Sequence, residues 1–187
     1  FIEGKRIGGY DDLRAHFGKP LPEPNATSYR PVLAVFAVAL GLALSLSWWS
    51  FGSPVSVRAA EWFVAFSMAM LAMLKLQDVE KFSGMFLGYD LLARRWVPYA
   101  YLYPYLEALA AILMAGRVLP WLSIPVALFI GTIGAVSVFY AVYVQKREIK
   151  CACVGGSASV PLGFVSLTEN LAMMAMGVWM LVRPALA

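Results

Sequence analysis

Five long apolar runs dominate the sequence. A run of roughly 18 to 25 such residues is what a helix needs to cross about 30 Å of hydrocarbon. The runs are Pro31 to Trp49, Val57 to Leu76, Trp96 to Ala115, Leu119 to Val144 and Val165 to Val182. Hydrophobic residues make up 61% of the 187 residues and mean hydropathy is +0.71, which excludes a soluble domain. We therefore predict an all-α membrane protein, a polytopic bundle of about five transmembrane helices.

The basic residues predict an orientation in the membrane. If the N-terminus is cytoplasmic, only Arg58, Arg117 and Arg183 of the 15 Lys and Arg residues face outward, as the positive-inside rule favours. The C-terminus then lies on the periplasmic or external side of a bacterial inner membrane. The net charge of +4 indicates attraction to the anionic headgroups of the bilayer and gives no reason to invoke nucleic acid.

The N-terminal residues differ in character from the apolar runs. Residues 1–19 predict a short strand, a turn and a helix that begins at Asp11 or Asp12. Residues 20–30 form a proline-rich linker, and residues 31–187 form the membrane domain. Because one strand and one helix cannot build a core, we expect residues 1–19 to be the tail of a larger soluble domain.

The pattern Phe1-Ile-x-Gly-x-x-Ile-Gly-Gly-x-Asp-Asp-Leu13 resembles the C-terminal end of a glutaredoxin, an α/β thioredoxin-like domain. The resemblance implies that Gly9, Tyr10 and Asp11 contact glutathione through backbone N–H groups at a helix N-terminus. The glutaredoxin Cys-Pro-Tyr-Cys site and its Thr-Val-Pro turn are absent from this sequence. The resemblance therefore covers about eighteen residues and implies a fused or separate glutaredoxin partner.

Both cysteines of the chain, Cys151 and Cys153, lie in the connection between the last two runs. A Cys-x-Cys disulfide closes a very small ring, so the bond is strained and easily reduced, which suits exchange better than structural support. Three cations precede the pair and Gly155-Gly156 follows it, and both features favour the thiolate. The alternative is a pair of reduced cysteines packed at a helix end.

The membrane segment resembles the MauE/DoxX-like redox-associated membrane proteins. The similarity rests on Lys75-Leu-x-Asp-x-x-x-Phe82, on Tyr89, on Pro104 with Glu107, and on the segment from Cys151 to Asn170. It implies thiol–disulfide chemistry, such as support of disulfide formation in a partner enzyme, and supplies no substrate.

Three functions remain open at this point. The first is a membrane thiol–disulfide oxidoreductase, in which glutaredoxin and glutathione exchange electrons through Cys151 and Cys153 with an unknown thiol partner protein or a quinone. The second is a transporter for a soft metal such as copper, zinc or mercury, or for a thiol conjugate, with the same two cysteines as ligands. The third is a non-catalytic membrane anchor that holds glutaredoxin near its clients.

Two carboxylates in or near the apolar runs are further site candidates, because ionisable groups at membrane depth are costly. Glu107 either accepts a proton in thiol chemistry or pairs with a cation on another helix. Glu169 either exchanges protons with the cysteines or supports a helix start, with Ser166 or Thr168 as N-cap. We expect Lys75, at the end of the second run, to be solvated or to snorkel.

Overall fold

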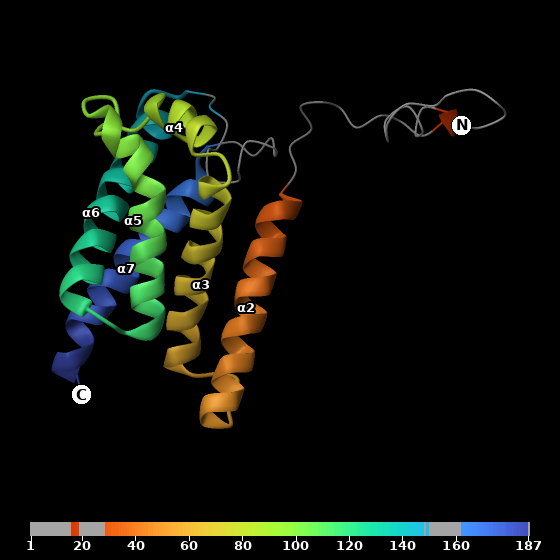
Figure 1. Ribbon diagram of the computed structural model, residues 1–187, viewed down its shortest axis with the longest axis vertical. Coiled ribbons are helices and arrows are strands. Elements are labelled where there is room, and N and C mark those ends of the chain that lie inside the picture. The colour runs from red at the N-terminus through yellow and green to blue at the C-terminus, as the bar shows by residue number, and fades with distance from the viewer. Residues whose placement is uncertain (1–15, 19–28, 148, 150–161, 187) are drawn as a thin grey trace.

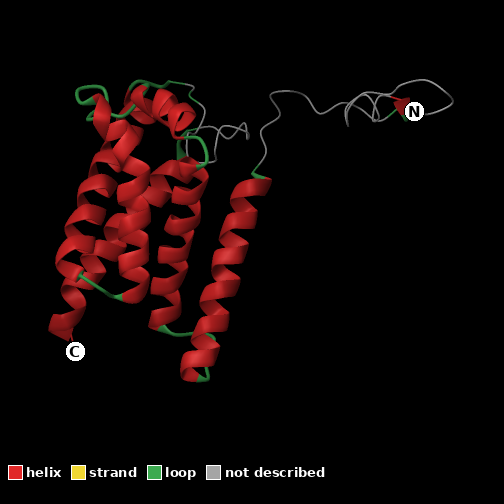
Figure 2. Cartoon of the chain, in the orientation of Figure 1, coloured by secondary structure: helices red, strands yellow, loops and turns green. Residues whose placement is uncertain are grey.

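The computed structural model describes residues 16–18, 29–147, 149 and 162–186, and these form helices joined by short connections (Figures 1 and 2). The elements are α2 (Arg30–Phe51), α3 (Val57–Leu76), α4 (Val79–Leu87), α5 (Val97–Gly116), α6 (Pro120–Phe139), the π-helical segment η1 (Tyr140–Val144) and α7 (Phe164–Leu186). The described residues contain no strand. Most of the glutaredoxin-like segment lies outside them, so the predicted strand and glutathione-contacting turn stay predictions.

The all-helical membrane fold is confirmed, and four of the five predicted spans are found among the described residues. Within the described residues, four helices are long and apolar enough to cross a membrane: α2, α3, α6 with η1, and α7. The third predicted span, Trp96 to Ala115, corresponds to α5, a 20-residue helix whose tyrosines, two prolines and one glutamate lower its hydropathy. It nevertheless packs between α3 and α6 in the same bundle (Figure 1).

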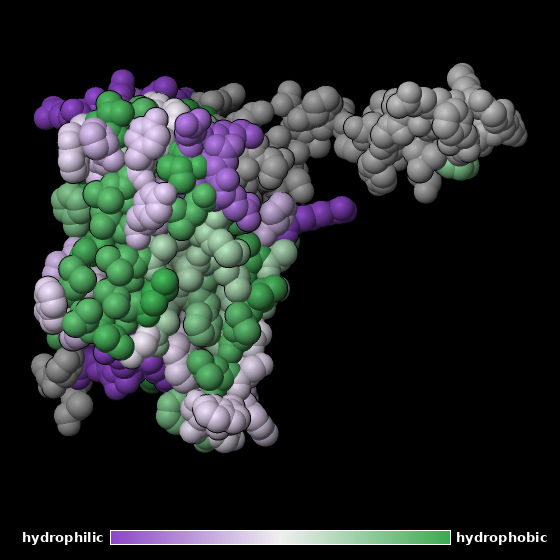
Figure 3. Space-filling view, viewed as in Figure 1, coloured by the Kyte–Doolittle hydropathy of each residue, from purple (hydrophilic) through white to green (hydrophobic). Residues whose placement is uncertain are grey.

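The described cations are divided unequally between the two ends of the bundle. Figure 3 shows mostly hydrophobic residues over the middle of the bundle and hydrophilic residues at both ends. The first end holds α4 and the exposed cations Lys81, Arg94, Arg95, Lys146 and Arg147. The second end holds Arg58, Arg117 and Arg183, at the start of α3 and near the ends of α5 and α7. Among the described residues, the predicted separation of the cations is therefore present, whereas the side of the membrane that each end faces stays a prediction.

Small residues permit close contact between α6 and α7. A Cβ added at Gly134 would lie 2.1 Å from Oδ1 of Asn170, and one at Gly131 would lie 3.1 Å from Met174. In the sequence, small residues recur four apart at Ala127, Gly131 and Ala135 in the run that became α6, and at Ala37, Gly41 and Ser45 in the run that became α2. This spacing predicts a packing seam on each of the two helices. The second prediction is wrong within this chain, because Gly41 is exposed and a Cβ there would meet nothing within 4 Å.

The short helix α4 covers the first end of the bundle. Asp78 caps it by accepting a hydrogen bond from the Lys81 N–H at 2.9 Å, and its buried face packs on α5. The Ser83 hydroxyl of α4 donates to the Ala100 carbonyl at 3.1 Å. Pro104 has no N–H to give that carbonyl, so Ser83 replaces the hydrogen bond that the proline removes.

The connection from α4 to α5 is organised by Asp90. Its Oδ1 accepts hydrogen bonds from the N–H groups of Leu92 at 3.0 Å and Ala93 at 2.8 Å. The adjacent Leu91 N–H donates to the Ser137 hydroxyl of α6 at 3.0 Å. Burial raises the pKa of the Asp90 carboxyl above its ordinary value of 3.8, by more than these hydrogen bonds lower it.

Candidate functional site

Lys75 is buried at the end of α3, contrary to the expectation that it would be solvated. Its side chain is 1% exposed because helix periodicity turns this position toward α5 and α7 instead of toward lipid or water. A buried ammonium needs anionic or polar partners, since isolated burial of a charge costs several kcal/mol or more.

Two carboxylates from two other helices supply those partners. The Nζ of Lys75 donates to Oε2 of Glu107 on α5 at 2.6 Å and to Oε1 of Glu169 on α7 at 2.5 Å. The exposed fraction of the side chain is 0% for Glu107 and 2% for Glu169. We call Lys75, Glu107 and Glu169 the buried charge cluster.

Aromatic and amide side chains enclose this cluster. The Lys75 ammonium lies 5.3 Å from the ring centre of Tyr103 and 6.0 Å from that of Phe82, within the range of cation–π attraction. Tyr103 also donates its hydroxyl to Oδ1 of Asn170 at 3.3 Å, and Nδ2 of Asn170 donates to the Ser166 carbonyl at 2.7 Å. The cluster is thus held in a rigid and weakly polar environment.

The charge balance of the cluster suits it for handling a proton. Two carboxylates face one ammonium, so the cluster carries a net charge of −1 when both are ionised and is neutral when they share one proton. Oε1 of Glu107 is buried and has no hydrogen-bond partner among the described residues. This oxygen is therefore placed to hold that proton.

The base of the cysteine-bearing connection is also defined. The Leu162 N–H donates to the Ile149 carbonyl at 2.6 Å, which joins the segment after η1 to the segment before α7. Glu169 lies five residues into α7 from Phe164, about 7.5 Å along the helix axis. The two described residues that flank the connection, Ile149 and Leu162, therefore lie at the end of the bundle where α7 begins, which is also the end that holds Glu169.

The predicted site residues have different outcomes. Glu107 and Glu169 are brought together, and Glu107 pairs with a cation on another helix as one interpretation expected. The helix-start interpretation of Glu169 is wrong, because α7 begins at Phe164 and the side chain of Glu169 points to Lys75. The remaining predicted site residues lie outside the described residues: Cys151, Cys153, Gly9, Tyr10 and Asp11.

Sequence reasoning missed the role of Lys75 and the whole cluster around Glu61 on α3. Glu61 is 3% exposed and accepts hydrogen bonds from Arg58, Arg117 and Trp179. The sequence held a signal for both clusters, because each combines cations and carboxylates that lie inside the predicted spans or at their ends. Charged residues at such positions usually pair with one another. Among the described residues, no group of three or more His, Cys, Asp or Glu could hold a metal ion.

The fold and the buried charge cluster define a multi-pass helical membrane protein with an ionisable site between its helices. A comparison with known families matches residues 53–183 to the family described as "Methylamine utilisation protein MauE". The match spans well over half of the 187 residues, so the chain belongs to the MauE family. It begins in the connection between α2 and α3, and it gives no support to a fused glutaredoxin.

The search of curated proteins and the search of solved structures each found no match.

Proposed function

We propose that this protein is a membrane thiol–disulfide oxidoreductase, in which Cys151 and Cys153 exchange electrons and the buried charge cluster accepts and returns the accompanying protons. The single observation that carries the proposal is the pairing of Lys75 with both Glu107 and Glu169, at the end of the bundle where Ile149 and Leu162 flank the cysteine-bearing connection. A buried group of this kind, with more carboxylates than cations, is a recurrent feature of proton-handling sites.

Chain length supports the link between the cysteines and the cluster. Cys151 follows Ile149 by two residues, so their Cα atoms are at most about 7 Å apart. The Ile149 carbonyl is hydrogen-bonded to Leu162, close to the start of α7. A thiol at position 151 is therefore tethered to the end of the bundle that holds Glu169.

The proposed exchange proceeds in two steps. One cysteine thiol gives its proton to the cluster, and the thiolate attacks a sulfur of oxidised glutathione, which releases one glutathione thiolate and leaves a mixed disulfide. The second cysteine then attacks the protein sulfur of that mixed disulfide, which releases the second glutathione and forms the Cys151–Cys153 bond. Two electrons pass from the protein to glutathione, and the two thiol protons leave with the glutathione thiols. Reduction by glutathione is the reverse.

The proposal includes an orientation and a partner. The end with α4 faces the cytoplasm, where a glutaredoxin with its glutathione reaches Cys151 and Cys153, and α5 completes a bundle of five spans. An unknown thiol partner protein or a quinone accepts or supplies the electrons on the other side of the reaction.

The test is the rate at which oxidised glutathione oxidises the reduced cysteines in detergent or nanodiscs, measured across pH 6 to 9 by alkylation and mass spectrometry. For Glu169→Gln we expect the rate to fall at least about tenfold near pH 7, since positioned acid–base groups contribute about 10²- to 10⁴-fold. At high pH the loss should disappear, because hydroxide then removes the proton.

The matched control is Glu80→Gln, the same change at an exposed position of α4. It should leave the rate unchanged at every pH. A Glu169→Gln rate equal to that of the control near pH 7, or a loss that is the same at every pH, would reject the proton-handling role.

A further inference from the structure

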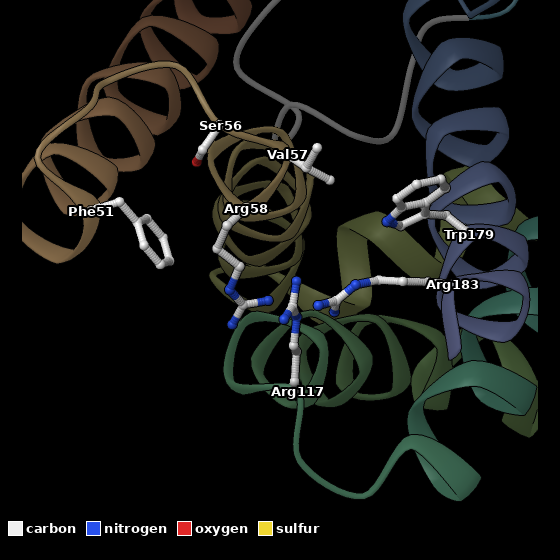
Figure 4. Close-up of a pocket in the computed structure, with 7 residues that line it drawn as sticks. All are labelled: Phe51, Ser56, Val57, Arg58, Arg117, Trp179 and Arg183. Atoms are coloured by element: carbon white, nitrogen blue, oxygen red, sulfur yellow. The ribbon is translucent and has the colours of Figure 1, made fainter. Parts of the chain in front are cut away.

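The second end of the bundle gathers the three arginines that the sequence places apart from all other cations. Arg58, Arg117 and Arg183 come from α3, from the end of α5 and from α7, and Figure 4 shows their guanidinium groups pointing toward one another. All three form ion pairs with Glu61, whose side chain is 3% exposed. We call Arg58, Arg117 and Arg183 the arginine group.

The three arginines differ in the hydrogen bonds that they donate to Glu61 and to neighbouring carbonyl groups. Arg58 donates to Glu61 at 2.8 Å and to the Ala115 carbonyl at 2.6 Å. Arg117 donates to Glu61 through both Nε and Nη2. Arg183 approaches Glu61 only to 3.8 Å, and its side chain is 41% exposed. A guanidinium has five N–H donors, so each arginine keeps donors for a further ligand.

The charges of this group are not balanced by its carboxylate. Three guanidinium groups and one carboxylate give a net charge of +2. Like charges held close together repel, and the repulsion is stronger near a low-dielectric membrane than in bulk water. An anion that binds between the arginines relieves this repulsion and accepts their remaining hydrogen bonds.

A pocket of about 530 Å³ lies over the arginine group. Its lining residues are Phe51, Ser56, Val57, Arg58, Arg117, Trp179 and Arg183 (Figure 4). The lining contains the three arginines and no carboxylate, because Glu61 lies beneath them. The remaining lining is mainly apolar, so the pocket fits an anion that carries an apolar part.

The position of the pocket along the bundle axis indicates the source of that anion. Trp48 and Trp49 at the end of α2 and Trp121 at the start of α6 are exposed at this same end of the bundle. Exposed tryptophans at the end of a spanning helix mark the level of the lipid headgroups. The pocket therefore opens at the level where phospholipid phosphates lie.

From this geometry we infer that the arginine group binds a phosphate group, supplied by the headgroup of an anionic phospholipid. The phosphate oxygens accept hydrogen bonds from Arg117 and Arg183, and the glycerol and upper acyl segments lie against Phe51 and Trp179. This site is on the opposite end of the bundle from the cysteine connection and does not depend on the proposed redox activity.

The experiment is a native mass spectrometry titration of the full chain in detergent with phosphatidylglycerol, compared with phosphatidylcholine. Arg183→Gln is the main variant, since Arg183 contributes least to the contacts with Glu61. The matched control is Arg94→Gln, which removes one positive charge from an exposed position at the first end. A third arm adds inorganic phosphate as a competitor.

We expect Arg183→Gln to weaken phosphatidylglycerol binding about tenfold, the effect of losing one charge-assisted contact of about 1.4 kcal/mol. Arg94→Gln should stay within about twofold of the unmodified chain, and phosphatidylcholine should bind more weakly than phosphatidylglycerol. Equal losses in the two variants would show a diffuse charge attraction and overturn the site. Displacement of the lipid by millimolar inorganic phosphate would overturn the lipid as the source of the phosphate.

Discussion

Replacement of Lys75 by methionine removes the ammonium that pairs with Glu107 and Glu169 while keeping a side chain of similar length. Both carboxylates stay buried, and each loses its ion pair with the Lys75 ammonium, which lies 2.6 Å from Glu107 and 2.5 Å from Glu169. Breaking a buried pair by removing one partner costs about 3–5 kcal/mol. We expect a value near the upper limit, because a single change leaves two carboxylates without their cation.

The assay is equilibrium unfolding in mixed detergent micelles, followed by the fluorescence of the six tryptophans. Lys81→Met is the matched control: it is the same change at an exposed position of α4 and should alter the free energy of unfolding by at most about 0.5 kcal/mol. Adding Glu107→Gln and Glu169→Gln to Lys75→Met should recover much of the loss, since neutral replacement of a whole buried charge network is often tolerated. Equal stabilities for Lys75→Met and Lys81→Met would refute the reasoning.

Two further predictions concern packing and pH. Gly134→Ala should destabilise the protein by about 1–3 kcal/mol through overpacking against Asn170, whereas Gly41→Ala should be neutral or stabilising by up to about 1 kcal/mol; equal effects on the free energy of unfolding would contradict the α6–α7 contact. The raised pKa of Asp90 means that the folded state holds this proton more tightly than the unfolded state, so its contribution to stability is full below pH 3.8 and is lost as the pH rises through the raised pKa. Unfolding measured from pH 4 to 7 should show this decrease, and Asp90→Asn should remove that part of the slope; an unchanged slope in the variant would count against it.

The positions of the helices could be predicted from the sequence because span length and hydropathy are local properties. The predicted run Val57 to Leu76 coincides with α3, and the other runs differ from their helices by a few residues. The separation of the cations could also be predicted, because the charge of each segment between two apolar runs can be counted directly from its residues. The third run showed the limit of this argument, because α5 packs as a bundle helix although its hydropathy is low.

The buried charge cluster could not be predicted as a unit, because its members are far apart in the chain. Lys75 is 32 residues from Glu107 and 94 residues from Glu169, and only the packing of α3, α5 and α7 brings them together. From its neighbours in the sequence alone, Lys75 was predicted to be solvated or to snorkel, because it lies near the end of an apolar run. The two partners that make its burial tolerable lie on other helices.

The small residues show the same limit. Ala127, Gly131 and Ala135 on α6 are buried, whereas Ala37, Gly41 and Ser45 on α2 share their spacing and are exposed. A four-residue spacing of small side chains permits close approach but does not select a partner helix. The partner is chosen by the rest of the interface, here by Asn170 and Met174 of α7.

The central claim is that Cys151 and Cys153 form a reversible redox pair. Its most direct test is a redox titration of the full chain in nanodiscs against glutathione buffers, read by alkylation and mass spectrometry, with and without added copper, zinc or mercury ions. We predict a reversible two-electron transition of both cysteines near the glutathione potential, with no requirement for metal. Thiols that stay reduced across the whole range, or that one metal ion protects stoichiometrically, would contradict the oxidoreductase, and the latter result would instead support the soft-metal transporter.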